Sequence, residues 1–386
     1  MNINELLFNM KSSLPVLLSS CCIVNGEVFP LAEVEKMGCL EFGRRSIINM
    51  PLKLYKFFPN TTKKDDSGEL VNYSQLALKN NTVFLQSPTE FDDVYDSDIN
   101  INYSEYVILR LREYCKRCKI EINDNASAEE LGSSLAQHCY IVYSDTGSFD
   151  SVFKRHPTSE PEKLSNQAFC LRLQLEHTKE NDLNKSIEMI INSDYDSLVS
   201  DLRQTFRVSC FATSPYSQLM WGGAYADFHK GFCLEYTVLP DDKQYKDILY
   251  SLFPMVYCKS RPNITAKLGG LEDQPLTEEK LWDIYFHGAL RKSIDWAYQN
   301  EWRLLLNMRK LKDSAQYNVK FFPVTKVFLG NRMPAKNRKE IIDICKQRNI
   351  PYVGVTRSPN MFEMCDCKTL CEDCPTFRTH LKQSSR

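Results

Sequence analysis

The last third of the chain constrains its fold most, because strand and helix patterns alternate there. VTKVFLG (residues 324–330) and IPYVGV (350–355) are short apolar runs typical of buried strands. NRKEIIDICKQRN (337–349) lies between them and has the apolar spacing of an amphipathic helix. Gly330 marks the first junction. Strands and helices mixed in this order predict an α+β domain.

Earlier segments extend the same mixture. TVFLQSP (82–88) is predicted as a short strand that ends at its proline, and EYVILRLREYCKRC (105–118) has helical apolar spacing with basic residues outside. LNKSIEMIINSDYDSLVSDLRQTF (183–206) is also helical in period. Two polar stretches, 59–72 and 144–166, are predicted to be surface loops.

Two strands and one helix are predicted in the middle of the chain. RVSCFATS (207–214) alternates apolar and more polar residues, as a half-buried strand does, and KGFCLEYTVL (230–239) gives a second strand. In LTEEKLWDIYFHGALRKSI (276–294), Thr277 is a good N-cap and two acids follow it. We therefore expect a helix from Thr277 that ends at the basic residues Arg291 and Lys292.

Composition limits the class of protein. The chain has 386 residues and is 43% hydrophobic, which suffices for one large or two modest domains with a core. Lys plus Arg is 48 and Asp plus Glu is 49, so no global charge attracts nucleic acid or an anionic membrane. The first 24 residues lack a basic opening and a span of about 18 apolar residues. We expect a cytoplasmic protein without a membrane partner.

Fifteen cysteines are many for such a chain. Without a secretory signal they are expected to be reduced thiols, core residues or metal ligands instead of a disulfide framework. Cys139, Cys170 and Cys233 lie in apolar surroundings and are predicted to be core residues.

The C-terminal segment CDCKTLCEDCP has the spacing of a metal site. Cys365, Cys367, Cys371 and Cys374 could converge on a tetrahedral Zn²⁺ or an iron–sulfur cluster, which would fold a tail too short for its own core. Four protein ligands leave no open position, so the role would be structural. The alternative is a disordered tail. Cys115-x-x-Cys118 could add ligands, or be only a half-buried pair on a helix.

A polar and aromatic cluster, WAYQNEWRLLL (296–306), precedes a predicted strand. Gln299 and Glu301 are two residues apart, so on a strand or its entry turn they point to the same face and could act together at one site. In the structural alternative, Glu301 pairs with Arg303 or caps a turn, while Trp296 and Trp302 pack a core.

Several ordered segments resemble a bacterial domain-of-unknown-function family, the one numbered 2971. The resemblance covers residues 51–362 and leaves an N-terminal segment, 1–50, and a Cys-rich tail, 363–386. The segments are LYKFFPN (54–60), LALKNNTVFLQSPTEFDDVYD (76–96), VSCFATS (208–214), QLMWGGAYADFHKGFCLEY (218–236), KSIDWAYQNEWRLL (292–305), VTKVFLGNRM (324–333) and IIDICKQRNIPYVGV (341–355).

That family distantly resembles the ADP-ribosyltransferase superfamily, whose members bind NAD in a cleft between two small sheets. The resemblance implies an ADP-ribosyltransferase-like split β-sheet core with helical insertions. Three superfamily motifs lie on separate strands: an early Arg or His, a midway Ser-Thr-Ser or Tyr element, and a late Gln/Glu-x-Glu. By resemblance, the last is Gln299-Asn300-Glu301, with Glu301 stabilising the charge that develops on the ribose and Gln299 addressing the acceptor.

The other two motifs depart from the superfamily pattern. The midway motif corresponds to Ala212-Thr213-Ser214, with Ala where the first Ser stands; Thr213 and Ser214 would brace the NAD ribose or the catalytic glutamate. The early motif corresponds to Tyr55-Lys56, which would contact NAD, although lysine lacks the planar fork of arginine. This departure bears on catalysis more than on fold.

Two more clusters are candidates for binding. MWGGAYADFHKGF sets Trp221 and Tyr225 beside two glycines, which suits either stacking of a nicotinamide or adenine ring or a packed aromatic hinge. Asp92, Asp93 and Asp96 could bind an acceptor base or a metal, or build a turn.

The expected function is transfer of ADP-ribose from NAD, as substrate, to a protein or nucleic-acid acceptor, or NAD hydrolysis. By analogy this suits a toxin or phage-defence effector. Two alternatives stay open: a non-catalytic nucleotide- or nucleic-acid-binding module of the same fold, and a metal-dependent nuclease that uses Asp92, Asp93 and Asp96.

Overall fold

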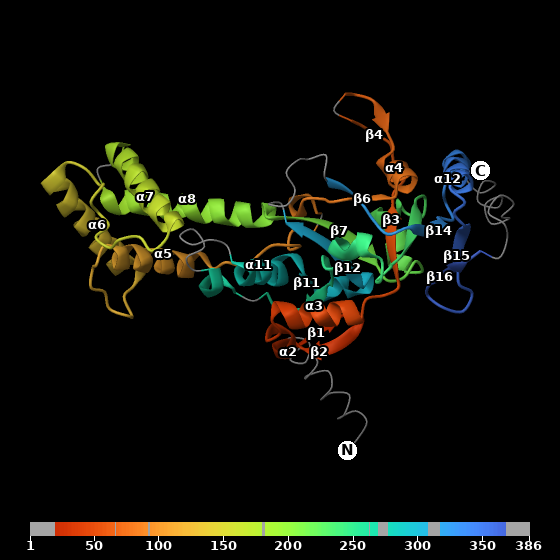
Figure 1. Ribbon diagram of the computed structural model, residues 1–386, viewed down its shortest axis with the longest axis horizontal. Helices are drawn as coiled ribbons and strands as arrows, with labels where there is room; N and C mark the ends of the chain where they lie inside the picture. The colour runs from red at the N-terminus through yellow and green to blue at the C-terminus, as the bar shows by residue number, and fades with distance from the viewer. Residues whose placement is uncertain are drawn as a thin grey trace, which may run out of the picture. The chain divides into compact units, whose positions relative to one another are not determined.

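The chain combines sheets with helices, which confirms the predicted α+β class. The computed structural model describes residues 20–65, 67–91, 93–179, 182–261, 263–268, 277–307 and 317–367. It divides into two compact units (Figure 1). The first unit comprises Met1–Tyr95, Thr205–Ser260 and Leu290–Arg386, and the second comprises Asp96–Gln204 and Arg261–Ala289.

An eight-stranded sheet forms the centre of the first unit. Its strand order is β16-β15-β14-β8-β3-β7-β12-β9, so strands far apart in sequence are neighbours (Figure 1). Only β14 and β15 pair in parallel, joined by α12 (Ala335–Gln347); the other neighbours are antiparallel. The strands are β3 (Lys53–Phe58), β7 (Phe206–Ala212), β8 (Phe232–Thr237), β9 (Leu252–Pro254), β12 (Glu301–Asn307), β14 (Val324–Leu329), β15 (Tyr352–Arg357) and β16 (Met364–Asp366).

Both faces of this sheet are packed. Successive residues on a strand point to opposite faces, so each strand contributes to two clusters. The larger cluster includes Trp302 and Leu304 and is covered by α12 and α4 (Tyr73–Asn80). The smaller cluster includes Tyr55 and Phe57 and is covered by α9 (Gln218–Gly222) and the short helix η2 (Ala224–Ala226).

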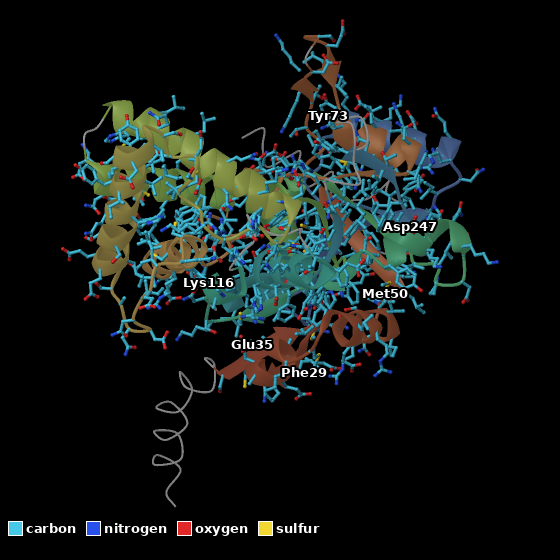
Figure 2. All side chains as sticks on the ribbon, turned by 60° about the vertical axis from the view of Figure 1, so that its left-hand side comes forward. Phe29, Glu35, Met50, Tyr73, Lys116 and Asp247 are labelled. Atoms are coloured by element: carbon cyan, nitrogen blue, oxygen red, sulfur yellow. The ribbon has the colours of Figure 1, made fainter. Side chains whose placement is uncertain are left out.

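A four-stranded sheet, ordered β11-β10-β1-β2, lies near the N-terminal helices. Phe29 and Glu35 belong to this region (Figure 2). Arg291 and Lys292, expected at a helix end, lie instead on strand β11 (Arg291–Ser293). The helix that starts after Thr277 continues as a π-helix over Tyr285–Ala289 and ends just before β11, where Arg291 reaches Glu35 at 3.0 Å. The remaining elements here are β1 (Cys21–Val24), β2 (Glu27–Pro30), β10 (Val256–Cys258), α2 (Leu31–Glu35) and α3 (Cys39–Ile48).

The first unit also contains short paired strands and short helices. The predicted strand at 82–88 is confirmed as β6 (Thr82–Phe84), which pairs with β13 (Asn318–Lys320). The predicted loop at 59–72 carries a short hairpin with exposed lysines, β4 (Lys63–Lys64) and β5 (Leu70–Val71). The short helices are η1 (Pro88–Glu90), η3 (Lys243–Tyr245), α10 (Lys246–Leu249) and η6 (Ile294–Gln299).

The second unit is helical in its described part. The helices predicted at 105–118 and 183–206 are confirmed as α5 (Tyr103–Arg117) and α8 (Leu183–Gln204). Asn102 caps α5, and Ser127 with Glu130 forms a capping box that starts α6. Its other elements are α6 (Ala128–Thr146), α7 (Glu160–Lys179), η4 (Thr265–Leu268), α11 (Glu278–Ile284) and the π-helix η5 (Tyr285–Ala289). The loop predicted at 144–166 is shorter, because α6 and α7 extend into it.

A buried ion network ties α5 to α7 in this unit. Glu162 is 3% exposed, and its carboxylate contacts Arg155 and lies 3.7 Å from the Nε of buried Arg117. Asn166 accepts a hydrogen bond from Arg117 at 2.8 Å. A buried charge is tolerated only when it is paired and hydrogen-bonded, so this network fixes the packing of the two helices.

Several buried cysteines lie in the core of the helical unit. Cys139 and Cys170 are buried as predicted, and Cys115 and Cys118 are fully buried instead of half-buried. Burial raises the pKa of Cys118, and the nearby thiols of Cys139, Cys115 and Cys170 raise it further. Burial also raises the pKa of Cys139 and of Cys170 to about 12. Cys233, in the first unit, is buried as well.

This burial predicts the order in which thiols react. At pH 8, iodoacetamide should modify the partly exposed Cys21 and Cys365 before Cys139 and Cys170, since a thiol with a pKa near 12 is only on the order of 0.01% thiolate at that pH. Peptide mass spectrometry over a time course measures the order, with the urea-unfolded chain as the control in which all sites react. Equal rates at Cys139 and Cys21 in the folded chain would contradict the packing.

Candidate functional site

Three strands bring together segments that are far apart in sequence. In the central sheet Glu301 of β12 pairs with Ala212 of β7, and Ala212 pairs with Tyr55 of β3. The row Tyr55–Ala212–Glu301 therefore crosses the three neighbouring strands β3, β7 and β12, and its side chains share one face of the sheet. Each of the three predicted motifs contributes one residue to this row.

Glu301 is a buried carboxylate held by two cations. The side chain is 6% exposed, and its Oε1 accepts a hydrogen bond from Arg303 Nε at 2.5 Å. Its Oε2 lies 3.4 Å from Lys292 Nζ. The Glu301 backbone N–H donates to the hydroxyl of Tyr257 at 2.8 Å. The predicted structural alternative, a pair with Arg303, is confirmed, and the structure adds Lys292 as a second partner.

Arg303 explains why this carboxylate is anchored so firmly. The Arg303 side chain is completely buried, and its guanidinium lies 5.4 Å from the centre of the Phe91 ring. Cys210 pairs with Arg303 in register, and burial raises the pKa of the Cys210 thiol to about 12, with Glu301 adding to the shift. The thiol is therefore neutral near pH 7, so Glu301 supplies the negative charge that the arginine faces.

Lys292 joins the two polar residues of the Gln-x-Glu motif. Its Nζ donates to Gln299 Oε1 at 3.0 Å as well as approaching Glu301, and it lies 5.0 Å from the centre of the Trp296 ring. Gln299 sits at the end of η6, and Asn300 has a left-handed backbone with φ of 39°. This turn brings both side chains to one lysine. Lys292 was not predicted as a site residue, because it was expected at a helix end.

Tyr225 forms the exposed edge of the cluster. Its hydroxyl accepts a hydrogen bond from Gln299 Nε2 at 2.8 Å, while 41% of the residue is exposed. Burial of the hydroxyl region raises the pKa of Tyr225. A ring that is exposed and held at one end can contact a planar ligand, so Tyr225 has the geometry for the stacking role predicted from sequence.

Trp221 lies in a different environment from Tyr225. It is completely buried, its indole N–H donates to the Pro215 carbonyl at 2.6 Å, and its ring meets Phe57 edge-on and His229 face-on. These contacts match the packed aromatic hinge that was the alternative for this segment. A ligand ring could stack on Trp221 only if Phe57 or His229 moved.

The residues of the midway motif lie beside the Gln-x-Glu turn. Thr213 Oγ1 accepts a hydrogen bond from Asn300 Nδ2 at 2.6 Å, so this motif is connected directly to the middle residue of the other. Ser214 is exposed, and its hydroxyl accepts from the Tyr216 backbone N–H at 3.2 Å. Thr213 thus braces the turn that carries Glu301.

The two residues of the early motif point to opposite faces. Tyr55 shares the face of Glu301, and its hydroxyl donates to Glu235 Oε2 at 3.2 Å. Lys56 Nζ donates to the Cys210 carbonyl at 3.1 Å and lies 5.3 Å from the centre of the Phe211 ring. Burial lowers the pKa of Lys56, and Glu301 opposes the shift. The lysine therefore adds a side-chain hydrogen bond between β3 and β7, whose backbone pairing is limited to Tyr55 and Ala212.

The predicted metal ligands are only partly within the described residues. Cys365 lies on β16 and Cys367 follows it, whereas Cys371 and Cys374 lie outside the described residues. In the described ranges, no group of three or more His, Cys, Asp or Glu side chains is arranged to hold a metal ion. The metal site in the tail stays a prediction.

The acidic segment behaves as a turn where it is described. Asp92 lies outside the described residues. Asp93 Oδ1 accepts from the Tyr95 backbone N–H at 3.0 Å, which is an Asx-turn. Asp96 is buried and accepts from the Ser97 hydroxyl at 2.9 Å. These contacts agree with the turn-building alternative.

Comparison with known families supports part of the resemblance seen in the sequence. The family described as "Protein of unknown function (DUF2971)" matches residues 220–304, a range that contains Trp221, Tyr225, Gln299 and Glu301. No curated protein and no solved structure matches the chain. No helix in the described part of the chain has the length and apolar character needed to cross a membrane.

The buried ion cluster predicts a large stability effect at Arg303. Arg303→Met should lower the free energy of unfolding by about 3–5 kcal/mol, because it removes the 2.5 Å partner of a buried carboxylate. Urea unfolding measures the loss. The control is Arg45→Met, which removes the 2.7 Å pair with the partly exposed Glu41 and should cost much less, because water screens exposed charges. Equal losses in the two variants would show that Arg303 does not organise this cluster.

Proposed function

We propose that the first unit binds NAD, cleaves its nicotinamide–ribose bond, and passes ADP-ribose to a macromolecular acceptor or to water. The observation that carries the proposal is the row Tyr55–Ala212–Glu301. Three segments that resemble the superfamily motifs are far apart in the sequence, yet they meet on adjacent strands and one face. The match to residues 220–304 supports the family resemblance but says nothing of activity.

Glu301 would act on the ribose. When the bond between ribose and nicotinamide breaks, the bonding electrons leave with the nicotinamide nitrogen, which becomes neutral, and positive charge develops on the sugar. A fixed carboxylate facing that charge lowers the barrier. The acceptor then attacks the sugar carbon and loses its proton to solvent or a base.

The two cations around Glu301 have different contacts, which matters for this role. Arg303 Nε lies 2.5 Å from Oε1, whereas Lys292 Nζ lies 3.4 Å from Oε2 and 3.0 Å from Gln299. A ribose hydroxyl would therefore replace the Lys292 contact at Oε2 more easily than the Arg303 contact at Oε1. Lys292 would keep its hydrogen bond to Gln299. Arg303 would keep the carboxylate oriented throughout.

Gln299 and Tyr225 would face the acceptor and a ring of NAD. Their side chains are hydrogen-bonded to each other, and Tyr225 has an exposed ring. Thr213 would hold the turn through Asn300. Tyr55 shares the face of Glu301 and would contact NAD, whereas Lys56 would act through the backbone of β7.

A non-catalytic nucleotide-binding module is the second candidate. The observation that favours it is the engagement of both Glu301 oxygens, one by Arg303 and one by Lys292. In that case the cluster would be structural, and a nucleotide would bind at the exposed Tyr225 edge without being cleaved.

The test is NAD consumption by the purified full chain, with and without protein, RNA and DNA acceptors. Removal of a transition-state contact costs about 100- to 1000-fold in kcat, so Glu301→Gln should lose activity on that scale. Gln299→Ala should lower transfer to the acceptor more than hydrolysis. Folding of each variant is checked by its unfolding temperature.

The matched control is Glu162→Gln in the helical unit. Glu162 is also a buried carboxylate paired with arginines, so its loss tests general destabilisation without touching the candidate site. We expect Glu162→Gln to keep wild-type NAD consumption. A folded Glu301→Gln variant with unchanged consumption contradicts the enzyme proposal. A wild type that binds NAD but never consumes it favours the binding module.

A further inference from the structure

A groove lies next to the midway motif and is lined in part by its last residue, Ser214. Its volume is about 410 Å³, and it opens between the segment after β7 and the tip of the β15–β16 hairpin. Its lining includes Ser214, Ser217, Gln218, Leu219, Phe362 and Glu363. Ser214 lies two residues beyond Ala212, the strand partner of Glu301, so the groove begins beside the candidate site.

The two walls of the groove are fixed to each other. The Met364 backbone N–H donates to the Tyr216 carbonyl at 2.9 Å, and the Tyr216 hydroxyl donates to Asp366 Oδ1 at 3.0 Å. Lys326 Nζ holds the other oxygen of Asp366 at 2.8 Å. The groove is therefore formed before any partner arrives, which lowers the entropic cost of binding.

The rim of the groove is apolar and exposed. Phe362 is 100% exposed at the hairpin tip, and Met361 beside it is 63% exposed. Leu219 on the opposite wall is 57% exposed. Large apolar side chains grouped on a surface and rimmed by polar residues mark interaction sites. The apolar rim can hold one apolar side chain of a partner.

The charge of the groove selects among partners. Glu363 is its one charged lining residue, and within the described residues its carboxylate has no ion pair. Nucleic acid needs lysines or arginines to neutralise its phosphates, and this lining supplies an acid instead. A lysine or arginine on the partner would complement Glu363, while Ser214 and Gln218 offer hydrogen bonds to a peptide backbone.

We propose that this groove docks an extended polypeptide segment that carries an apolar anchor next to a lysine or arginine. The anchor packs between Phe362 and Leu219, and the basic side chain pairs with Glu363. The identity of the acceptor rests on the proposed function. If that function holds, the docked polypeptide is the acceptor of ADP-ribose, so the acceptor is a protein.

The test uses the full chain, without NAD, and a positional library of immobilised octapeptides. We expect selection of an apolar residue adjacent to lysine or arginine. Phe362→Ser should weaken binding of the selected peptides about tenfold or more, as loss of a central anchor does. Glu363→Lys should replace the preference for basic residues with one for acidic residues. Phe84→Ser, which removes a 48% exposed aromatic elsewhere in the same unit, should leave selection unchanged.

Three results would overturn the docking proposal. They are selection without an apolar and basic preference, unchanged selection by Phe362→Ser, and binding of oligo(dT) that Phe362→Ser abolishes. Wild-type NAD consumption is measured separately. Selective peptide binding without NAD consumption supports the docking proposal and contradicts the enzyme proposal. NAD consumption without peptide selection supports the enzyme proposal and contradicts the docking proposal.

Discussion

The completely buried guanidinium of Arg303 is the constraint on which the centre of the first unit depends. A charge removed from water costs several kcal/mol unless an opposite charge and good hydrogen bonds compensate it. Glu301, two residues earlier and on the same face of β12, provides this compensation at 2.5 Å. Lys292, on a strand of the other sheet, then approaches the second carboxylate oxygen, so the ion cluster also connects the two sheets.

Strand β12 separates apolar packing from the buried ion cluster by the alternation of its side chains. Trp302 and Leu304 enter the larger hydrophobic cluster, while Glu301 and Arg303 point to the other face. The apolar half holds the strand in register, with the Trp302 indole N–H also donating to Asn25 at 3.0 Å. The polar half is thereby positioned by residues whose side chains lie on the opposite face. A shift of one residue would exchange the two halves, so the register is strongly specified.

The sequence predicted what local patterns determine. Apolar spacing identified α5, α8 and α12, alternation identified β7, and apolar surroundings identified the buried thiols of Cys139 and Cys170. Long-range pairing lay beyond it. Lys292 was expected to end a helix, and only the partner strand β10 shows why it extends as a strand. Likewise, neighbouring residues on a strand always point to opposite faces, but only the register with Ala212 shows that Tyr55, and not Lys56, shares the face of Glu301.

Under the proposed function, the same cluster would have to satisfy two demands that compete. A carboxylate kept for structure is held most firmly when both oxygens are paired, whereas one kept for chemistry needs an oxygen that a substrate can reach. The contacts of Glu301 are unequal in this respect, at 2.5 Å to Arg303 and 3.4 Å to Lys292. Lys292 also has Gln299 at 3.0 Å, so its charge stays hydrogen-bonded if the carboxylate oxygen turns to a ligand. Under the proposed function, one oxygen would thus serve the fold while the other binds the substrate.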